Sequence, residues 1–244
     1  MNYNWNWSAF FDASPEGVGT YMDTLIQGGI TTLWTALISF AIAFVLGSAV
    51  GILRTLPGRR IGAFAICYVE LFRNIPLLMQ MFLWYFVLPE ALPTDISRWI
   101  KALPDGSFYT AVICLGFYTS SRVAEQVRAG ILALPPGQRA AGLALGLSRG
   151  QTYRYVLLPM AYRMILPPLT SEFLNNTKNT SVALTIGLLE ITARARAMQE
   201  FSFQVFEAFA AATVFYLAVN MISVRVMQVV ERRVAVPGFI AGKA

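Results

Sequence analysis

Three basic residues fall inside, or at the ends of, long apolar stretches of the sequence: Arg73, Arg163 and Lys178. A charge in such a place is expensive inside a membrane, so it faces the interior of a helix bundle or a water-filled path. Arginine binds a carboxylate through two parallel N–H donors, whereas lysine acts as a point charge. No acidic residue lies three or four positions from Lys178, so a transient anionic partner would suit it. Arg73 and Lys178 therefore predict a path for an anion, with Arg73 as its stronger determinant.

Acid–base, metal and nucleotide chemistry find little support in the rest of the sequence. There is no histidine, which removes the commonest general base and the commonest metal ligand. Cys67 and Cys114 lie in apolar segments without a CxxC spacing, so we expect no disulfide and no metal site. No GxxxxGK[ST] pattern occurs, so the chain does not cradle ATP by that device. We therefore expect a protein that is not itself an enzyme and that holds no cofactor.

A polar break interrupts the apolar segment 61–88, where residues 70–86 read ELFRNIPLLMQMFLWYF. Pro76 breaks the hydrogen-bond ladder of a helix, and Arg73 and Asn74 stand just before the break. Irregular backbone at membrane depth is tolerated where it is buried or lines a cavity, so both residues are candidates for a substrate path. A Glu70–Arg73 pair, three residues apart on one helix face, is the structural alternative and is compatible with such a path.

Two further polar stretches are candidates for the interior. In YTSSRVAEQVRAGI (118–131), Glu125 and Arg128 lie three residues apart, which favours a local ion pair. Arg163 lies only a couple of helical turns into its apolar segment, and we assign it a structural or gating role. The stretch EFLNNTKNTS (172–181) either ends a loop at the outer surface or lines a passage, and its lining candidates are Asn175, Lys178, Asn179 and Thr180.

The stretch GQRAAGLALGLSRGQTYRYVLLP (137–159) is rich in small residues and stands between two apolar segments. Proline suits the first turn of a helix, so the preceding Pro-Pro pair predicts a helix start, and Gly146 offers the stop. Ser148 and Gln151 match a capping box, which predicts a second helix from about Arg149. A short helix with a nearly bare surface, a turn and a second helix would invite close docking of another protein.

The composition is that of a membrane protein, since 56% of the 244 residues are hydrophobic and 13% are charged, against about 25% charged in soluble domains. A spanning helix needs about 20 apolar residues. We expect an all-α polytopic bundle with five spans, near 28–53, 61–88, 108–123, 155–174 and 205–230. The range 182–189 is too short to cross alone, so we interpret it as re-entrant or interfacial, with a sixth span as the alternative. Residues 1–27 lack Lys, Arg and a short apolar core, which predicts no cleavable signal peptide.

The basic residues predict the orientation. With 137–159 in the cytoplasm, the twelve inside are Arg54, Arg59, Arg60, Arg122, Arg128, Arg139, Arg149, Arg154, Arg225, Arg232, Arg233 and Lys243. The four outside are Arg98, Lys101, Arg194 and Arg196, and the last two are a misfit that keeps the six-span alternative open. We therefore expect a periplasmic segment 1–27, a membrane domain 28–230 with a cytoplasmic loop 135–159, and a cytoplasmic tail 231–244. The net charge of +6 is then explained by the orientation of the chain in the membrane rather than by nucleic-acid binding.

The stretch 137–159 resembles the EAA loop of the integral-membrane subunits of bacterial ABC importers. At the expected spacings stand Gly146, Val156, Leu158 and Pro159. Where Glu-Ala-Ala is expected stand Ala140, Ala141 and Gly142, so the acidic residue is missing. The resemblance implies an ATPase-coupling role for Gly137, Ala140, Ala141, Gly142, Gly146, Leu158 and Pro159.

Other stretches resemble the polar amino acid permeases among these subunits. FRNIPLL resembles their FRGTPLL-type stretch in the form of the glutamate/aspartate branch, and 118–131 resembles A-E-x-x-R-G-G-I, with Ala129 at the first glycine. The stretch 172–181 resembles N-x-x-K-x-T-S. The resemblance covers nearly the whole chain and is strongest to the first of two paired permeases of a glutamate/aspartate importer.

This resemblance implies a type I importer fold with five helices, N-terminus in the periplasm, in the bacterial inner membrane. It implies pairing with a second permease chain, with a homodimer as the alternative. Two ATPase subunits, carrying ATP and Mg²⁺, would bind the cytoplasmic loops, and a periplasmic amino-acid-binding protein would deliver the substrate. An ion-gradient-driven secondary transporter, or an ABC permease for another polar amino acid, is the alternative function.

Overall fold

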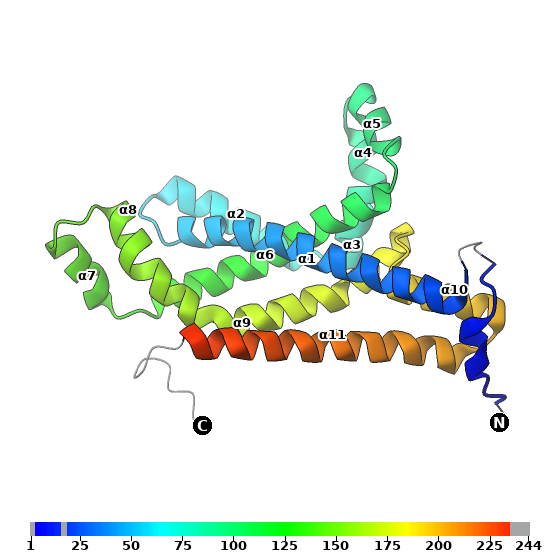
Figure 1. Cartoon of the computed structure of the whole chain (residues 1–244). Coiled ribbons are helices and arrows are strands. Elements are labelled where there is room, and N and C mark those ends of the chain that lie inside the picture. Colours follow the sequence, from blue (N-terminus) through cyan, green and yellow to red (C-terminus); the bar gives the residue numbers. More distant parts are fainter. Residues whose placement is uncertain (1–2, 16–18, 235–244) are drawn as a thin grey trace. The chain divides into compact units, whose positions relative to one another are not determined.

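The computed structural model describes residues 3–15 and 19–234, and these residues are helical apart from turns, short irregular stretches and one isolated β-bridge between Ala13 and Thr20 (Figure 1). In chain order the helices are η1 Trp7–Phe11, α1 Tyr21–Leu53, α2 Arg59–Asn74, α3 Leu77–Phe82, η2 Leu83–Val87, α4 Leu88–Ala91, α5 Thr94–Lys101, α6 Gly106–Leu132, α7 Pro136–Ala144, α8 Arg149–Thr152, η3 Tyr153–Leu157, α9 Leu158–Asn179, η4 Thr180–Ile186, α10 Ile191–Ser202 and α11 Val205–Val234. The predicted all-α fold is confirmed for this part of the chain. Of the predicted cytoplasmic tail, 235–244 lie outside the described residues, as do 1–2 and 16–18 of the predicted periplasmic segment.

Among the described helices, α1 and α11 are long and apolar enough to cross a membrane. With 33 residues, α1 is roughly 50 Å long at the usual helical rise. A third candidate is Arg59–Asn74 together with Leu77–Ala91, taken as one broken span. The helices over the other two predicted spans, α6 and α9, are long enough but carry charged side chains. Length and composition therefore support two or three of the five predicted spans.

The predicted span 61–88 is not one continuous helix. The helix α2 ends at Asn74, and Ile75 is extended, with φ −88° and ψ 128°. The ring of a proline disfavours helical backbone in the residue before it, so Pro76 accounts for the break where the sequence predicted one. The next helix starts at Leu77.

Residues 182–186 of the short apolar range 182–189 belong to the tight helix η4, and Gly187 with φ 84° follows its end. Seven residues of this type of helix span roughly 14 Å, well short of the bilayer core. The following helix α10 has twelve residues and is not among the candidate spans in the part of the chain that the structure describes. The sixth span therefore finds no support here.

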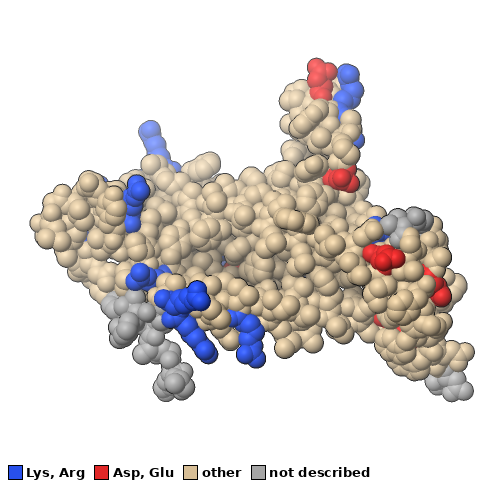
Figure 2. Space-filling model, viewed as in Figure 1, with Lys and Arg blue, Asp and Glu red and all other residues tan. Residues whose placement is uncertain are grey.

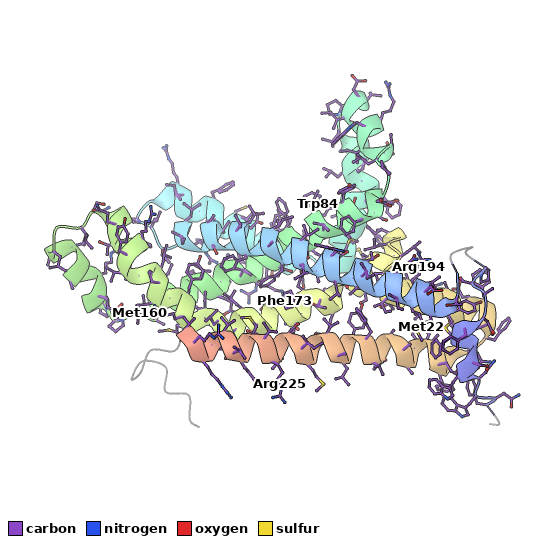
Figure 3. The ribbon with its side chains drawn as sticks, viewed as in Figure 1. Met22, Trp84, Met160, Phe173, Arg194 and Arg225 are labelled. Atoms are coloured by element: carbon purple, nitrogen blue, oxygen red, sulfur yellow. The ribbon has the colours of Figure 1, made fainter. Side chains whose placement is uncertain are left out.

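The chain divides into two compact units, and the long helices pass from one unit into the other. The first comprises Met1–Phe40, Pro76–Gly116 and Asn175–Met221. Its core joins η1, the start of α1, α10 and α11, and its buried residues are Ala9, Phe10, Tyr21, Leu25, Ile191, Ala195, Met198, Ala208 and Ala212. Met22, labelled in Figure 3, packs against this core. In Figure 1, α4 and α5 form a hairpin within this unit. An ion pair with 2.5 Å between Lys101 Nζ and Glu90 Oε1 joins the two helices.

The second unit comprises Ala41–Ile75, Phe117–Leu174 and Ile222–Ala244. Glycines let its helices approach closely, because a Cβ on Gly51 would stand 2.6 Å from the carbonyl oxygen of Ala124 on α6. Further along α6, a Cβ on Gly130 would stand 2.5 Å from Ile165 Cγ2 on α9. The ring of Phe72 on α2 packs against Phe117 on α6, with their centroids 5.3 Å apart. These contacts hold α1, α2, α6 and α9 together around the charged residues described below.

The two units differ in charge. The second holds fourteen of the nineteen basic residues, and the five in the first are Arg98, Lys101, Lys178, Arg194 and Arg196. The first holds nine of the thirteen acidic residues, and the four in the second are Glu70, Glu125, Glu172 and Glu231. Figure 2 shows Lys and Arg side chains gathered over the C-terminal part of α11, within the second unit.

Candidate functional site

The loop between α6 and α9 is folded as the sequence predicted. The helix α7 begins at Pro136, and Gly146 beyond its end has φ 81°, a left-handed conformation that glycine adopts without strain. The N–H of Leu147 donates to the Gly142 carbonyl at 3.2 Å, and the N–H of Gly146 donates to the Leu143 carbonyl at 3.0 Å. This pair of bonds is a Schellman motif, which satisfies the last carbonyls of α7.

The predicted capping box is also confirmed. The N–H of Gln151 donates to Ser148 Oγ at 3.3 Å, and the N–H of Ser148 donates to Gln151 Oε1 at 2.8 Å. These bonds satisfy donors at the start of α8, which begins at Arg149 as expected. The turn between α7 and α8 is therefore fixed by backbone and side-chain hydrogen bonds at both of its ends.

Two contacts that the sequence did not predict hold this loop in place. Gly142 is buried, and a Cβ there would stand 2.8 Å from Thr152 Cγ2, so α7 packs directly on α8. The hydroxyl of Tyr153 donates to the carbonyl oxygen of Thr55 at 3.0 Å, just beyond the end of α1. A cavity of about 210 Å³ opens beside Tyr153, and it is also lined by Pro135 and Arg139. The loop is thus tied to the turn that follows α1.

Apart from Arg139, the exposed residues of α7 are small or apolar. Ala140 and Ala141 are exposed, and Leu145 after the helix is 81% exposed. Of the predicted coupling residues, Gly142 is buried against Thr152, and its part in coupling stays a prediction. The others, Gly137, Ala140, Ala141, Gly146, Leu158 and Pro159, are exposed or half-buried. Leu158 and Pro159 begin α9 and lie outside the α7–α8 turn.

Glu125 on α6 is the centre of a charged cluster within the second unit. Its Oε1 forms an ion pair with Arg54 and lies 3.8 Å from Arg73 Nη1, and its Oε2 lies 3.7 Å from Arg128 Nη1. The predicted Glu125–Arg128 pair is therefore present. The contribution of Arg54 was missed, because 71 residues separate it from Glu125 and no local spacing links them.

The predicted Glu70–Arg73 pair is wrong. Asn74 Nδ2 donates to Glu70 Oε2 at 2.7 Å, so the carboxylate bonds the residue four positions on, and Arg73 instead faces Glu125. Arg73 and Asn74 are adjacent on α2, so their side chains point in different directions and reach different partners. Arg163 is exposed on α9 and makes no ion pair within residues 3–15 and 19–234, so its structural or gating role stays a prediction.

The polar residues at the end of α9 separate into exposed and buried positions. Asn175 and Lys178 are exposed and Asn179 is half-buried, whereas Thr180 is fully buried and donates to the Thr177 carbonyl at 2.8 Å. As a lining residue Thr180 stays a prediction, although its side chain is buried in this chain. The sequence also missed Asn176, which is buried in the first unit.

The amide of Asn176 bridges from α9 to α1 within the first unit. Its Nδ2 donates to the Ala36 carbonyl at 3.0 Å and to Ser39 Oγ at 2.8 Å. Buried polar groups need such partners, since an unmade hydrogen bond costs the full desolvation penalty. Asn176 thus holds α9 and α1 together, while Asn175 and Lys178 on the same helix are exposed.

Comparison with known proteins gives consistent matches. Residues 43–236 match the family described as "Binding-protein-dependent transport system inner membrane component". The chain is 46% identical to the glutamate/aspartate import permease protein GltJ of Escherichia coli (strain K12), with all of both chains covered. It is 33% identical to the glutamine transport system permease protein GlnP of the same strain, over 95% of this chain and 98% of that one.

Solved structures match over most of the chain. An "amino acid ABC transporter with histidines" superposes with a TM-score of 0.74 and 29% identity, over 87% of this chain and 95% of that one. The MetNI methionine ABC transporter superposes with a TM-score of 0.72 at 19% identity, over 87% of this chain and 97% of that one, which supports the fold. With its α7–α8 loop and these matches, the chain belongs to the family of binding-protein-dependent transport system inner membrane components.

Proposed function

We propose that this chain, the inner-membrane permease component of a binding-protein-dependent ABC importer, carries glutamate or aspartate into the cell. The observation that carries the proposal is the 46% identity to a glutamate/aspartate import permease over the whole of both chains. The cluster of guanidiniums around Glu125 supports it, because arginine is suited to two-point binding of carboxylates. Family membership argues against the alternative of an ion-gradient-driven transporter.

In the proposed topology the chain crosses the membrane five times, with 1–27 in the periplasm, the membrane domain at 28–230 and the tail 231–244 in the cytoplasm. The candidate spans α1 and α11 and the broken pair after α1 support part of this arrangement. The concentration of basic residues in the second unit supports a cytoplasmic location for its loops, since such loops are rich in Lys and Arg.

The loop 135–159 is the proposed docking element for the ATPase. A binding-protein-dependent permease implies a binding protein and an ATPase as partners. We propose one ATPase subunit on this loop and a second on a paired permease chain, with ATP and Mg²⁺ bound by the ATPases. The exposed Ala140, Ala141 and Leu145 support docking, since bare apolar surface permits close approach of another protein. A rigid loop also transmits the movement of its partner to the membrane helices.

The substrate path is proposed to include Arg73 and Asn74 in the second unit and Asn175, Lys178 and Asn179 in the first. The exposed guanidinium of Arg73 suits the side-chain carboxylate of the substrate. The exposed ammonium of Lys178 supplies a second positive charge without fixed geometry. Because the two residues belong to different units, each is tested separately.

A glutamine importer is the second candidate, since the chain is 33% identical to a glutamine transport permease. The test is uptake of labelled glutamate, aspartate, glutamine and arginine into proteoliposomes that hold the assembled importer and its binding protein. We expect glutamate and aspartate to be carried, and Arg73→Lys and Lys178→Gln to slow them, with Arg73→Lys the stronger effect. Arg225→Gln, an exposed residue of α11 labelled in Figure 3, is the matched control. Good uptake of arginine by the wild type, or normal glutamate uptake by both variants, would overturn the proposal.

A further inference from the structure

A single carboxylate in the second unit is shared by three guanidiniums. The exposed fractions of the side chains differ: Arg54 is 10% exposed, Glu125 25%, Arg128 39% and Arg73 54%. Burial makes an uncompensated charge costly, so the nearly buried Arg54 needs the carboxylate most. Its contact with Glu125 is also the closest of the three.

Arg73 is held much less tightly. Its Nη1 lies 3.8 Å from Glu125 Oε1, which is within reach of charge attraction but too far for a hydrogen bond. A guanidinium has five N–H donors in a fixed fork. Glu70, the acid three residues before Arg73, accepts a hydrogen bond from Asn74. The guanidinium of Arg73 is therefore exposed, and the carboxylate of the nearby Glu70 is already bonded to Asn74.

We propose that Glu125 is the resting counter-ion of Arg73, and that the side-chain carboxylate of a transported acidic amino acid replaces it. This inference rests on the proposed function and adds to it a residue that sets affinity and specificity by competition. The cluster carries three positive charges against one negative charge, so a second carboxylate is favoured electrostatically. Glu125 stays with Arg54, while Arg73 exchanges a long ionic contact for two hydrogen bonds to the substrate.

Competition of this kind explains how a site is selective for acids and still releases them. Without Glu125 the cluster would bind a carboxylate more tightly and hold it longer. A neutral amide such as the side chain of glutamine accepts fewer charge-assisted hydrogen bonds from the fork and gains little from the positive charge. Glu125 should therefore act on glutamate and aspartate and leave glutamine unaffected.

The test is equilibrium binding of labelled glutamate and labelled glutamine to the assembled permease–ATPase complex in detergent, without the binding protein. We expect Glu125→Gln to strengthen glutamate binding by about tenfold, the effect of one charge-assisted hydrogen bond, and to leave glutamine binding unchanged. Adding Arg73→Lys to Glu125→Gln should remove the gain. Glu231→Gln on α11 is the matched control, since it removes one negative charge from the same unit outside this cluster.

Glu125→Gln leaves Arg54 without its counter-ion, so a second variant separates a folding defect from a change in binding. The double variant Arg54→Gln with Glu125→Gln removes both charges of the closest pair and should show the same gain at Arg73. An unchanged glutamate affinity, a parallel change for glutamine, or binding too weak to detect in both variants would overturn the inference. Wild-type uptake in proteoliposomes is measured alongside: its failure with glutamate would reject the proposed function, whereas normal uptake without the gain rejects the role of Glu125 alone.

Discussion

Gly142 on α7 lies against Thr152 so closely that a Cβ at the glycine would stand 2.8 Å from the threonine Cγ2. Thr152 is 1% exposed and its Oγ1 donates to the Ser148 carbonyl at 3.0 Å, so it has little room to move. The residue that the sequence suggested as a docking contact is thus the internal packing point of the loop. Its exposed neighbours remain to meet the ATPase.

Gly142→Val should separate α7 from α8 and weaken coupling. Forcing additional carbon atoms into a packed contact costs about 1–3 kcal/mol, which is enough to displace a nine-residue helix. We expect normal membrane insertion, weaker co-purification of the ATPase and uptake reduced about tenfold or more. The control is Gly137→Val, because a Cβ at Gly137 meets nothing within 4 Å. An equal loss of uptake in both variants would mean that uptake depends on added bulk at the surface of α7 and not on the packing of α7 against α8.

Gly146→Leu should fail for a different reason. At φ 81° the backbone is left-handed, which costs roughly 1–2 kcal/mol for a residue with a Cβ, although the space around Gly146 is open. Gly146→Asn should be tolerated better, since asparagine adopts this conformation at lower cost. ATP hydrolysis stimulated by the loaded binding protein measures the outcome. If Gly146→Leu and Gly146→Asn show the same stimulated ATP hydrolysis, the conformation of the turn does not limit coupling.

Tyr153→Phe should uncouple the loop from α1 while keeping the ring in place. The variant loses only the hydroxyl that donates to the Thr55 carbonyl, a net effect of about 1 kcal/mol on stability. We expect ATP hydrolysis to persist and its stimulation by the loaded binding protein to fall, so that less substrate is moved per ATP. Tyr155→Phe, at an exposed tyrosine two positions on, is the matched control. An unchanged ratio of uptake to hydrolysis in Tyr153→Phe would contradict this role.

The parts of the site that the sequence predicted are local. Ser148 and Gln151 satisfy each other across three residues, and the left-handed turn at Gly146 needs only a glycine after a helix, so both were visible as patterns. The ion pair of Glu125 with Arg128 is equally local, whereas that of Glu70 with Arg73 failed at the same spacing. Spacing places two charges on one face, but tertiary packing decides which partner is nearer.

The parts that were missed join distant segments. Arg54 and Glu125 are 71 residues apart, Thr55 and Tyr153 are 98, and Ala36 and Asn176 are 140. Such pairs depend on which helices lie together, and apolar segments of similar composition give no signal for this choice. Glycines such as Gly51 offered a partial signal, since small residues mark close helix contacts, but they do not name the helix contacted.

The proposed five-span topology predicts the side on which each loop lies. Reporter fusions at Ala102, Gly150 and Ala197 should report outside, inside and outside. The reasons are the concentration of basic residues in the second unit, which holds Gly150, and the η4 helix, which at roughly 14 Å is too short to return the chain across the membrane before Ala197. Arg194 and Arg196 lie close to Ala197 and oppose this assignment, since basic residues favour the cytoplasmic side even where an acidic residue such as Glu200 pairs with one of them. A cytoplasmic signal at Ala197 in the wild type would therefore replace five spans by six.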